Sequence, residues 1–334
     1  MDYYGVDVHK RFSVFTCIDE QGQILDRCRV PNTPEELGRA VARSGGTARV
    51  VLEATGNWSY IYEALEPWVA QVLLAYPLRV RAIAAAKVKT DRIDADTLAN
   101  LLRVDLIPAA YIAPREVQDQ RDWLRSRAAV LWMAVQLKNR IHALLAKNSL
   151  NSPVSDLFGK KGLVWLKGLE LRPVHQRILG RYLQLLDILE ADVKETTAEV
   201  AREARRDSRF RLLMTIPGIG SLTAMVFLAE VGDLNRFSDA RCLVSYAGLA
   251  PRVRASGGHV YLGPITKQGS PALRWLFTEA AMKAGHLPGR LGDFYRRIQR
   301  RHGKQTAAIA LARKLLVIAY FVLKRRRSYC EEWG

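Results

Sequence analysis

The chain has 334 residues, of which 49% are hydrophobic and 25% are charged, a composition that excludes a disordered or low-complexity protein. Its 51 lysine and arginine residues outnumber its 33 aspartate and glutamate residues, which gives a formal net charge of +18. Because such an excess of positive charge favours polyanionic partners, we expect the protein to bind nucleic acid.

Cysteine usage and hydropathy indicate the compartment. The cysteines have neither disulfide-framework nor zinc-ligand spacing, and they are Cys17, Cys28, Cys242 and Cys330. Charged residues interrupt the N-terminal stretch, so no signal-peptide core is predicted. The apolar stretch 306–323 contains Arg313 and Lys314 near its middle, which favours a buried helix over a membrane span. We expect a cytoplasmic protein without a membrane partner.

The N-terminal third alternates predicted strands and helices. Strands are predicted over 3–8, 11–18, 24–30, 49–54 and 72–76. Thr33 and Pro34 predict the start of a helix that ends near 44–46, and a second helix is predicted over about 60–68. This is the element order of the ribonuclease H and RuvC-like fold, in which the first and fourth strands are neighbours.

Four acidic residues in this region form a candidate metal site. Asp7 and Glu53 end the first and fourth predicted strands, and Asp91 and Asp94 open a later predicted helix, where a spacing of three places both on one face. Crowded carboxylates are tolerated chiefly when cations neutralise them, so we predict a site for two Mg²⁺ ions. The alternatives are structural: Asp91 is an N-cap with Asp94 in the first turn, and Asp7 and Glu53 are solvated strand ends.

The middle of the chain is predicted to be helical. Pro108 and Pro114 mark a linker, and long helices are predicted over 116–150 and from 173 to about 206. Leu124, Ala128, Leu131 and Val135 repeat at four-three-four spacing. A heptad rhythm in the second helix links Tyr182, Leu186, Leu189, Val193, Thr196 and Val200. These helices can form a hairpin within one chain or a coiled coil between chains, and the spacing does not decide between them.

The C-terminal third carries candidate phosphate contacts. Residues 216–220 form a predicted turn of the helix-hairpin-helix type, in which Gly218 and Gly220 either approach a phosphate or simply make a tight turn. Residues 251–258 are expected to form an irregular basic loop, with Arg252 and Arg254 as nucleic-acid contacts, and Lys267 continues the positive charge. The run 324–327 is either a phosphate-binding segment or a solvated terminus.

Ser256 lies among these basic residues. A serine in such surroundings commonly contacts phosphate or forms a turn. Alternatively, it is a nucleophile whose attack on phosphorus is eased by the positive charge.

Five motifs together resemble the DEDD transposases of the insertion sequence one-ten group and the related Piv DNA invertases. In chain order they are 5–10 (GVDVHK), 52–56 (LEATG), 89–95 (KTDRIDA), 216–220 (IPGIG) and 246–252 (YAGLAPR). The resemblance covers nearly the whole chain. It implies a RuvC-like domain at 1–112, a coiled-coil helical linker at 113–208 and a C-terminal transposase domain at 209–334.

The resemblance also implies a mechanism. The family acids map onto Asp7, Glu53, Asp91 and Asp94, and the catalytic serine maps onto Ser256, with Ser245 and Ser270 as weaker alternatives. The implied enzyme is a recombinase guided by a bridge RNA that pairs with donor and target double-stranded DNA. It acts as a homo-oligomer, from dimer to tetramer, through a covalent phosphoserine intermediate. Two other functions remain: a hydrolytic Holliday-junction nuclease, and a non-catalytic nucleic-acid-binding protein.

Overall fold

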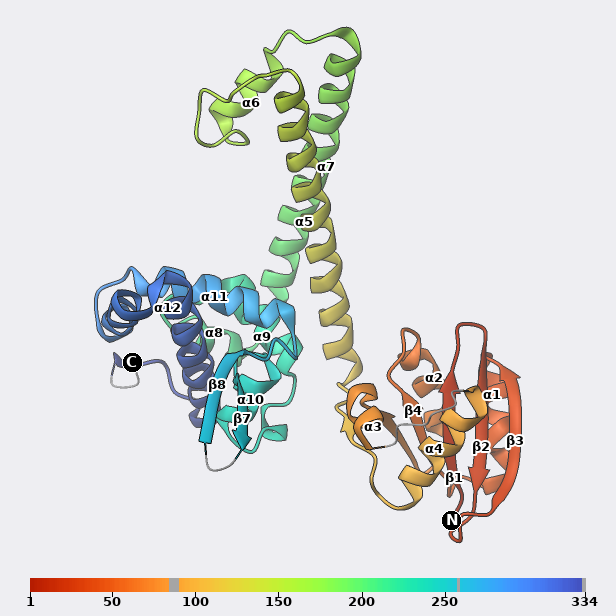
Figure 1. Ribbon diagram of the computed structural model, residues 1–334. Coiled ribbons are helices and arrows are strands. Elements are labelled where there is room, and N and C mark those ends of the chain that lie inside the picture. Colours follow the sequence, from red (N-terminus) through yellow and green to blue (C-terminus); the bar gives the residue numbers. More distant parts are fainter. Residues whose placement is uncertain (84–89, 257–258, 332–334) are drawn as a thin grey trace. The chain divides into compact units, whose positions relative to one another are not determined.

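The chain divides into two compact units, Met1–Ile112 and Ala113–Gly334, in a computed structural model that describes residues 1–83, 90–256 and 259–331 (Figure 1). Lys89, the first residue of one family motif, lies outside the described residues. The three-part division expected above stays a prediction.

The first unit contains a sheet and flanking helices. In chain order its elements are β1 (Tyr3–Val8), β2 (Phe12–Ile18), β3 (Ile24–Pro31), α1 (Pro34–Val41), η1 (Ala42–Ser44), β4 (Arg49–Glu53), α2 (Trp58–Leu65), η2 (Glu66–Trp68), β5 (Gln71–Ala75), α3 (Pro77–Ile83), α4 (Asp91–Arg103) and β6 (Ala109–Ala110). Within the described residues the strand order is β3-β2-β1-β4-β5-β6. β1 is antiparallel to β2 and parallel to β4, so the predicted pairing of the first and fourth strands is confirmed.

Two local predictions in this unit have clear outcomes. Thr33 is the N-cap of α1, and its hydroxyl accepts a hydrogen bond from the Glu36 N–H at 3.4 Å, as predicted. The boundary between the two units lies between Pro108 and Pro114, where the linker was predicted, but the first part of that stretch forms β6, which pairs with β5. The strand is two residues long, too short to give a periodic pattern.

The two faces of β1 have different roles. Tyr4, Val6 and Val8 point into the core that α1 and α2 cover, with Leu37 and Ile61 among its buried residues. Since side chains alternate along a strand, Gly5 and Asp7 face the opposite side, where α4 packs. Gly5 lets the helix come close: a Cβ at this position would lie 2.0 Å from the carbonyl oxygen of Ala95.

We therefore expect Gly5→Ala to lower the free energy of unfolding by about 3 kcal/mol or more, because either α4 or β1 must shift. Urea denaturation measures the change. Gly56→Ala is the matched control, since an added Cβ there meets nothing within 4 Å. Equal stability of the two variants would contradict the close packing of α4 on β1.

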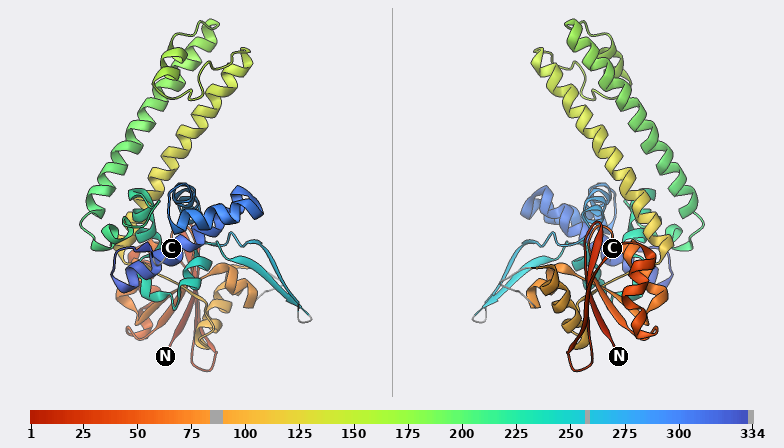
Figure 2. Two further views of the ribbon diagram at one scale, coloured as in Figure 1. Left: turned by 90° about the vertical axis from the view of Figure 1, so that its left-hand side faces the viewer. Right: turned by 90° about the vertical axis from the view of Figure 1, so that its right-hand side faces the viewer.

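The second unit is mainly helical. Its elements are α5 (Arg115–Lys147), α6 (Lys160–Lys167), α7 (Pro173–Ala204), α8 (Ser208–Leu213), α9 (Ser221–Val231), η3 (Leu234–Arg236), α10 (Ala240–Tyr246), β7 (Pro251–Ser256), β8 (His259–Ile265), α11 (Pro271–Gly285) and α12 (Arg290–Arg325). Long helices were predicted at the places of α5 and α7, and they lie side by side within one chain (Figures 1 and 2). This is the hairpin alternative. A coiled coil between chains stays untested.

The contacts between α5 and α7 correct the predicted seam. Ala128 and Val135 are exposed, so they do not belong to the seam between α5 and α7 within this chain. The inward side of α5 includes Leu124, as predicted, and in addition Ala134 and Ile141. The error has a physical cause: polar residues also occupy the seam. The Arg127 guanidinium donates to the Thr197 hydroxyl at 2.6 Å, and Lys138 pairs with Glu190 at 2.6 Å.

Helices α8 to α12 share one core of buried residues, including Phe227, Phe277 and Leu315. By length and hydropathy α12 resembles a membrane span, but 61% of its apolar window is buried inside the protein, as in a core helix.

The prediction of an irregular loop over 251–258 is wrong, because residues 251–256 form strand β7. β7 and β8 form an antiparallel pair in which Ser256 is opposite His259, and the two residues between them lie outside the described part of the chain. Figure 2 shows the pair as a narrow ribbon that extends beyond the helices of its unit.

Candidate functional site

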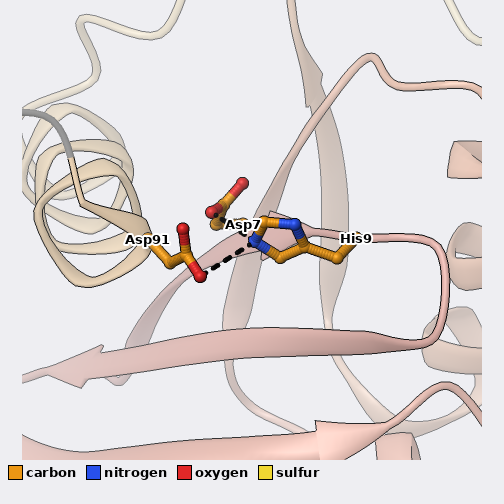
Figure 3. Close-up of side chains that lie close together, drawn as sticks. All are labelled: Asp7, His9 and Asp91. Atoms are coloured by element: carbon orange, nitrogen blue, oxygen red, sulfur yellow. Dashed lines mark hydrogen bonds and ion pairs between the residues drawn. The ribbon is translucent and has the colours of Figure 1, made fainter.

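Three side chains converge on the face of the sheet that α4 covers. Asp7 is in β1, His9 follows that strand, and Asp91 is the first residue of α4. Their ligand atoms all lie within 4.8 Å of one another. His9 Nε2 is 3.1 Å from Asp7 Oδ2 and 3.2 Å from Asp91 Oδ2. Figure 3 shows one nitrogen of the imidazole facing both carboxylates.

The local sequence explains why Asp91 is available. Thr90, not Asp91, is the N-cap of α4, because its hydroxyl accepts a hydrogen bond from the Ile93 N–H at 3.3 Å. The capping alternative for Asp91 is therefore wrong. Asp94 is in the first turn of the helix, as that alternative expected, and the positive end of the helix dipole stabilises both carboxylates.

A second set of contacts holds α4 in place. Asp96 accepts hydrogen bonds from the Thr16 hydroxyl at 2.7 Å and from Arg27 Nη2 at 2.6 Å. Thr16 and Arg27 are paired residues of β2 and β3, so one carboxylate ties the helix to two strands. These contacts fix the position of the helix that carries Asp91.

His9 is also held from several sides. Its backbone carbonyl accepts hydrogen bonds from Asn32 at 2.8 Å and Asn57 at 3.0 Å. Its ring stacks on Phe12 with a centroid distance of 4.5 Å, and the Arg29 guanidinium lies 3.5 Å from the centroid of Phe12. Sequence reasoning did not select His9. Its position two residues after Asp7 was the available signal, since such residues share a face of extended chain.

Asp7 is 7% exposed, and its environment disfavours the charged form. Burial is the largest cause that raises the pKa of Asp7; His9 acts in the opposite direction, while the charges of Asp91 and Asp94 raise it further. A carboxylate cluster of this kind fits a divalent cation, whose charge would offset the repulsion. Carboxylate oxygens suit hard cations, and imidazole nitrogen adds a ligand for transition metals.

The pKa of Asp7 gives a pH prediction. A carboxyl group whose folded pKa is raised makes the metal-free protein less stable as pH rises from 3.8 through that raised value. We therefore expect metal-free Asp7→Asn to unfold at a higher temperature than the wild type at pH 7. The difference should vanish below about pH 4. Thermal unfolding in EDTA between pH 3 and 8 measures it, and a difference that does not change with pH would contradict the assignment.

Glu53 occupies the neighbouring strand. It ends β4, and the register of β1 and β4, in which Val6 is opposite Leu52, places the following residues Asp7 and Glu53 side by side on the same face. Among the described residues, the cluster with ligand atoms within 4.8 Å nevertheless contains neither Glu53 nor Asp94. The structure thus joins Asp7 and Asp91 closely, with Asp94 as an electrostatic neighbour of Asp7 and Glu53 on the adjacent strand.

The predicted residues of the second unit have separate locations. Ser256 is the last residue of β7, and Arg252 and Arg254 are in the same strand. Lys267 is exposed, with a positive φ of 57°, and its N–H donates to the Gly248 carbonyl at 3.1 Å. The alternative serines also have places: Ser245 is exposed in α10, and the Ser270 hydroxyl caps α11 by accepting from the Leu273 N–H at 3.3 Å.

The turn between α8 and α9 requires glycine at one position. Gly218 has a φ of +86°, and a Cβ there would lie 2.3 Å from the carbonyl oxygen of Ala280 in α11. Packing therefore accounts for Gly218. Gly220 is the exposed N-cap of α9, and an added Cβ would meet nothing within 4 Å. Contact of either residue with phosphate stays a prediction.

Sequence comparison shows that the chain is similar to known transposases. A family model described as transposase, of the DEDD type of IS110, matches residues 4–148, and a model for the transposase IS116/IS110/IS902 family matches residues 210–296. The transposase for IS1328 of Yersinia enterocolitica is 27% identical over 95% of both chains. The transposase for IS1111A of Coxiella burnetii is 27% identical over 97% of this chain and 90% of its own.

The pilin gene-inverting protein of Moraxella bovis is 39% identical over 36% of this chain and 38% of its own. These matches and the acidic cluster define a DNA recombinase of the transposase class. Because the matched segments include the acidic cluster, the turn between α8 and α9 around Gly218 and the β7–β8 pair, the assignment extends to the family level. The chain belongs to the IS110 family of DEDD transposases.

Proposed function

We propose that this transposase is guided by a bridge RNA and joins donor and target double-stranded DNA through a serine nucleophile. The proposal is carried by one observation: Asp7, His9 and Asp91 converge on one face of the sheet in a chain of this family. The strand order β3-β2-β1-β4-β5 supports a RuvC-like, ribonuclease H type of fold for residues 1–112. Residues 113–208 and 209–334 are the proposed linker and transposase domains.

In this proposal Asp7, Glu53, Asp91 and Asp94 hold two Mg²⁺ ions, with His9 as an added ligand or a positioning group. Bound cations would polarise the phosphodiester and stabilise charge on the attacking and leaving oxygens. The acidic residues would bind and orient the cations, with Asp7 as the buried member of the cluster. Asp96 keeps Asp91 in position through its contacts with Thr16 and Arg27.

Ser256 is the proposed nucleophile. Its hydroxyl oxygen forms a bond to phosphorus as the phosphorus–oxygen bond to the leaving deoxyribose breaks, and the serine proton ends on the released hydroxyl group. One phosphodiester replaces another, so rejoining requires no nucleotide cofactor. The position of Ser256 at the end of a narrow ribbon, with Arg252 exposed in the same strand, supports access to a DNA strand.

The acidic residues belong to the first unit and Ser256 to the second. We propose that a complete site is assembled in a homo-oligomer, from dimer to tetramer, in the bacterial or archaeal cytoplasm near the nucleoid. The guide RNA, not the protein, would contain the target and donor sequences.

A reconstituted reaction tests the proposal. Purified protein, Mg²⁺, the RNA transcribed from beside the gene, and donor and target DNA should give a recombinant product whose junction changes when the pairing segments of the RNA are changed. A product that forms equally well without the RNA would contradict the proposal that an RNA guides the enzyme. Cleaved ends without attached protein would instead favour the hydrolytic nuclease.

A further inference from the structure

A cavity of about 860 Å³ lies in the C-terminal part of the chain, apart from the residues assigned above. Its walls come from α8, the end of α9, η3 and the last turn of α12. Its volume is within the range of ligand sites, roughly 300–1,000 Å³. The apolar part of the lining includes Leu228 and Leu234. The cavity therefore has a defined set of walls that are partly apolar.

The charged part of the lining is mainly cationic. Four basic side chains line the cavity, and they are Arg209, Arg211, Lys324 and Arg326. Arg211 comes from α8, and Lys324 and Arg326 come from the end of α12, so the charges converge from segments that are more than 100 residues apart. Lys324 Nζ donates to the Asn235 side chain at 3.1 Å, which holds the ammonium group at the wall formed by η3.

Two carboxylates also line the cavity, and both have partners. Asp207 receives hydrogen bonds from Arg209 Nη2 at 2.7 Å and Nε at 2.9 Å. Burial opposes ionisation, but these bonds hold the pKa of Asp207 below its ordinary value. Asp233 accepts a hydrogen bond from the Asn235 N–H at 2.9 Å and caps η3. Within the described part of the chain, the guanidinium groups of Arg211 and Arg326 have no hydrogen-bond or ion-pair partner, so both are free to contact an anion.

Arg326 gives a second, independent observation. It ends α12 in the left-handed conformation, with φ 52° and ψ 39°, and the Arg327 N–H donates to the Val322 carbonyl at 3.1 Å, as in a Schellman motif. Glycine is the usual residue at this position because side chains destabilise it. Basic residues favour helix C-termini through the dipole, but that effect does not require arginine at the left-handed position. Strained residues of this kind are typical of binding sites.

We propose that this cavity binds the phosphodiester backbone of a nucleic acid, with Arg211, Lys324 and Arg326 as the phosphate contacts. Planar guanidinium groups match phosphate oxygens bidentately, and converging cations from separate segments recognise a charged backbone without regard to sequence. The inference rests on the proposed function in that nucleic acid is the substrate. It adds a contact region that is separate from both the acidic cluster and Ser256.

Fluorescence anisotropy on the full chain tests the cavity. The probes are a duplex DNA, a single-stranded DNA and an RNA hairpin, each titrated between 50 and 300 mM salt. For at least one probe, the Arg211→Gln/Arg326→Gln variant should bind about 10- to 100-fold more weakly. The slope of log Kd against log salt should fall by about 1.4 to 1.8, since each of the two phosphate contacts contributes about 0.7 to 0.9. The probe that responds identifies DNA or RNA as the source of the backbone.

Arg202→Gln/Arg206→Gln is the matched control, because it removes the same charge from exposed arginines outside the cavity lining. It should change Kd less than about threefold. Equal effects of the two double variants on every probe would overturn the proposal. Asp7→Asn separates this result from the proposed function: it should bind all probes normally, and if it still cleaved DNA, the metal mechanism would fail while the cavity result would stand.

Arg326→Gly provides a test in which stability and binding change in opposite directions. Glycine removes the strain of the left-handed position, so the melting temperature should rise by about 2–4 °C, while binding of the responsive probe weakens. If the variant melts at a higher temperature and binds every probe as the wild type does, Arg326 contacts no backbone and the proposal is wrong.

Discussion

Asp7→Asn is expected to reduce DNA strand cleavage by at least about 10³-fold while DNA binding stays within about twofold. Asparagine keeps the shape of the side chain but removes its negative charge. It therefore weakens cation binding at the buried centre of the cluster, where several kcal/mol of transition-state stabilisation depend on that charge. Cleavage of a labelled duplex in Mg²⁺ measures the loss.

Asp26→Asn is the matched control, because Asp26 is an exposed carboxylate of the same unit and lies outside the cluster. It should cleave as the wild type does. Stability provides a second measurement: Mg²⁺ or Mn²⁺ should raise the melting temperature of the wild type and not that of Asp7→Asn. Cleavage by Asp7→Asn at the wild-type rate would contradict a catalytic role for the cluster.

Ser256→Ala is expected to abolish the covalent protein–DNA adduct and to reduce recombination by at least about 10³-fold, because it removes the proposed nucleophilic hydroxyl group. Denaturing gels with labelled DNA detect the adduct. The proposed metal site of the Ser256→Ala variant should be unaffected, so Mg²⁺ should still raise the melting temperature of this variant as it does for the wild type.

The alternative serines provide the controls. Ser245→Ala should keep the adduct. Ser270→Ala should also keep it, although it should lose about 1 kcal/mol of stability, since its hydroxyl caps α11. An adduct that persists in Ser256→Ala and disappears in Ser245→Ala or Ser270→Ala would identify Ser245 or Ser270, not Ser256, as the nucleophile. If no adduct forms with any protein although cleavage depends on Asp7, the hydrolytic nuclease is the better description.

Much of the first unit could be predicted from sequence because its signals are local. Apolar alternation and continuous β-branched runs located β1 to β5, and Thr33 followed by Pro34 located the start of α1. The pairing of β1 with β4 followed from element order. β6 could not be found, because a two-residue strand gives no period.

The candidate site was only partly predictable, because its geometry depends on distant residues. Asp91 could be a metal ligand only if another residue capped α4. Thr90 is the N-cap, but threonine and aspartate both cap helices well, so the sequence could not decide between them. His9 gained significance only when α4 brought Asp91 within 3.2 Å of its ring. The loop expected around Ser256 was wrong because its alternating pattern is short, although the two glycines that follow it are typical of a hairpin connection.

The polar contacts along α5 and α7 also limit how these helices can slide. Arg127 pairs with Thr197 near the base of the hairpin, and Lys138 pairs with Glu190 further along. Burial lowers the pKa of Arg127, which shows that its charge is costly to place there. A shift by one heptad would break both pairs and would set one cation opposite an apolar residue, Lys138 opposite Leu183 in one direction or Arg127 opposite Ala204 in the other. The two polar pairs together therefore favour the observed alignment. The first helix of the hairpin has 33 residues and a length of about 50 Å, and the two polar pairs oppose the sliding of α7 along it.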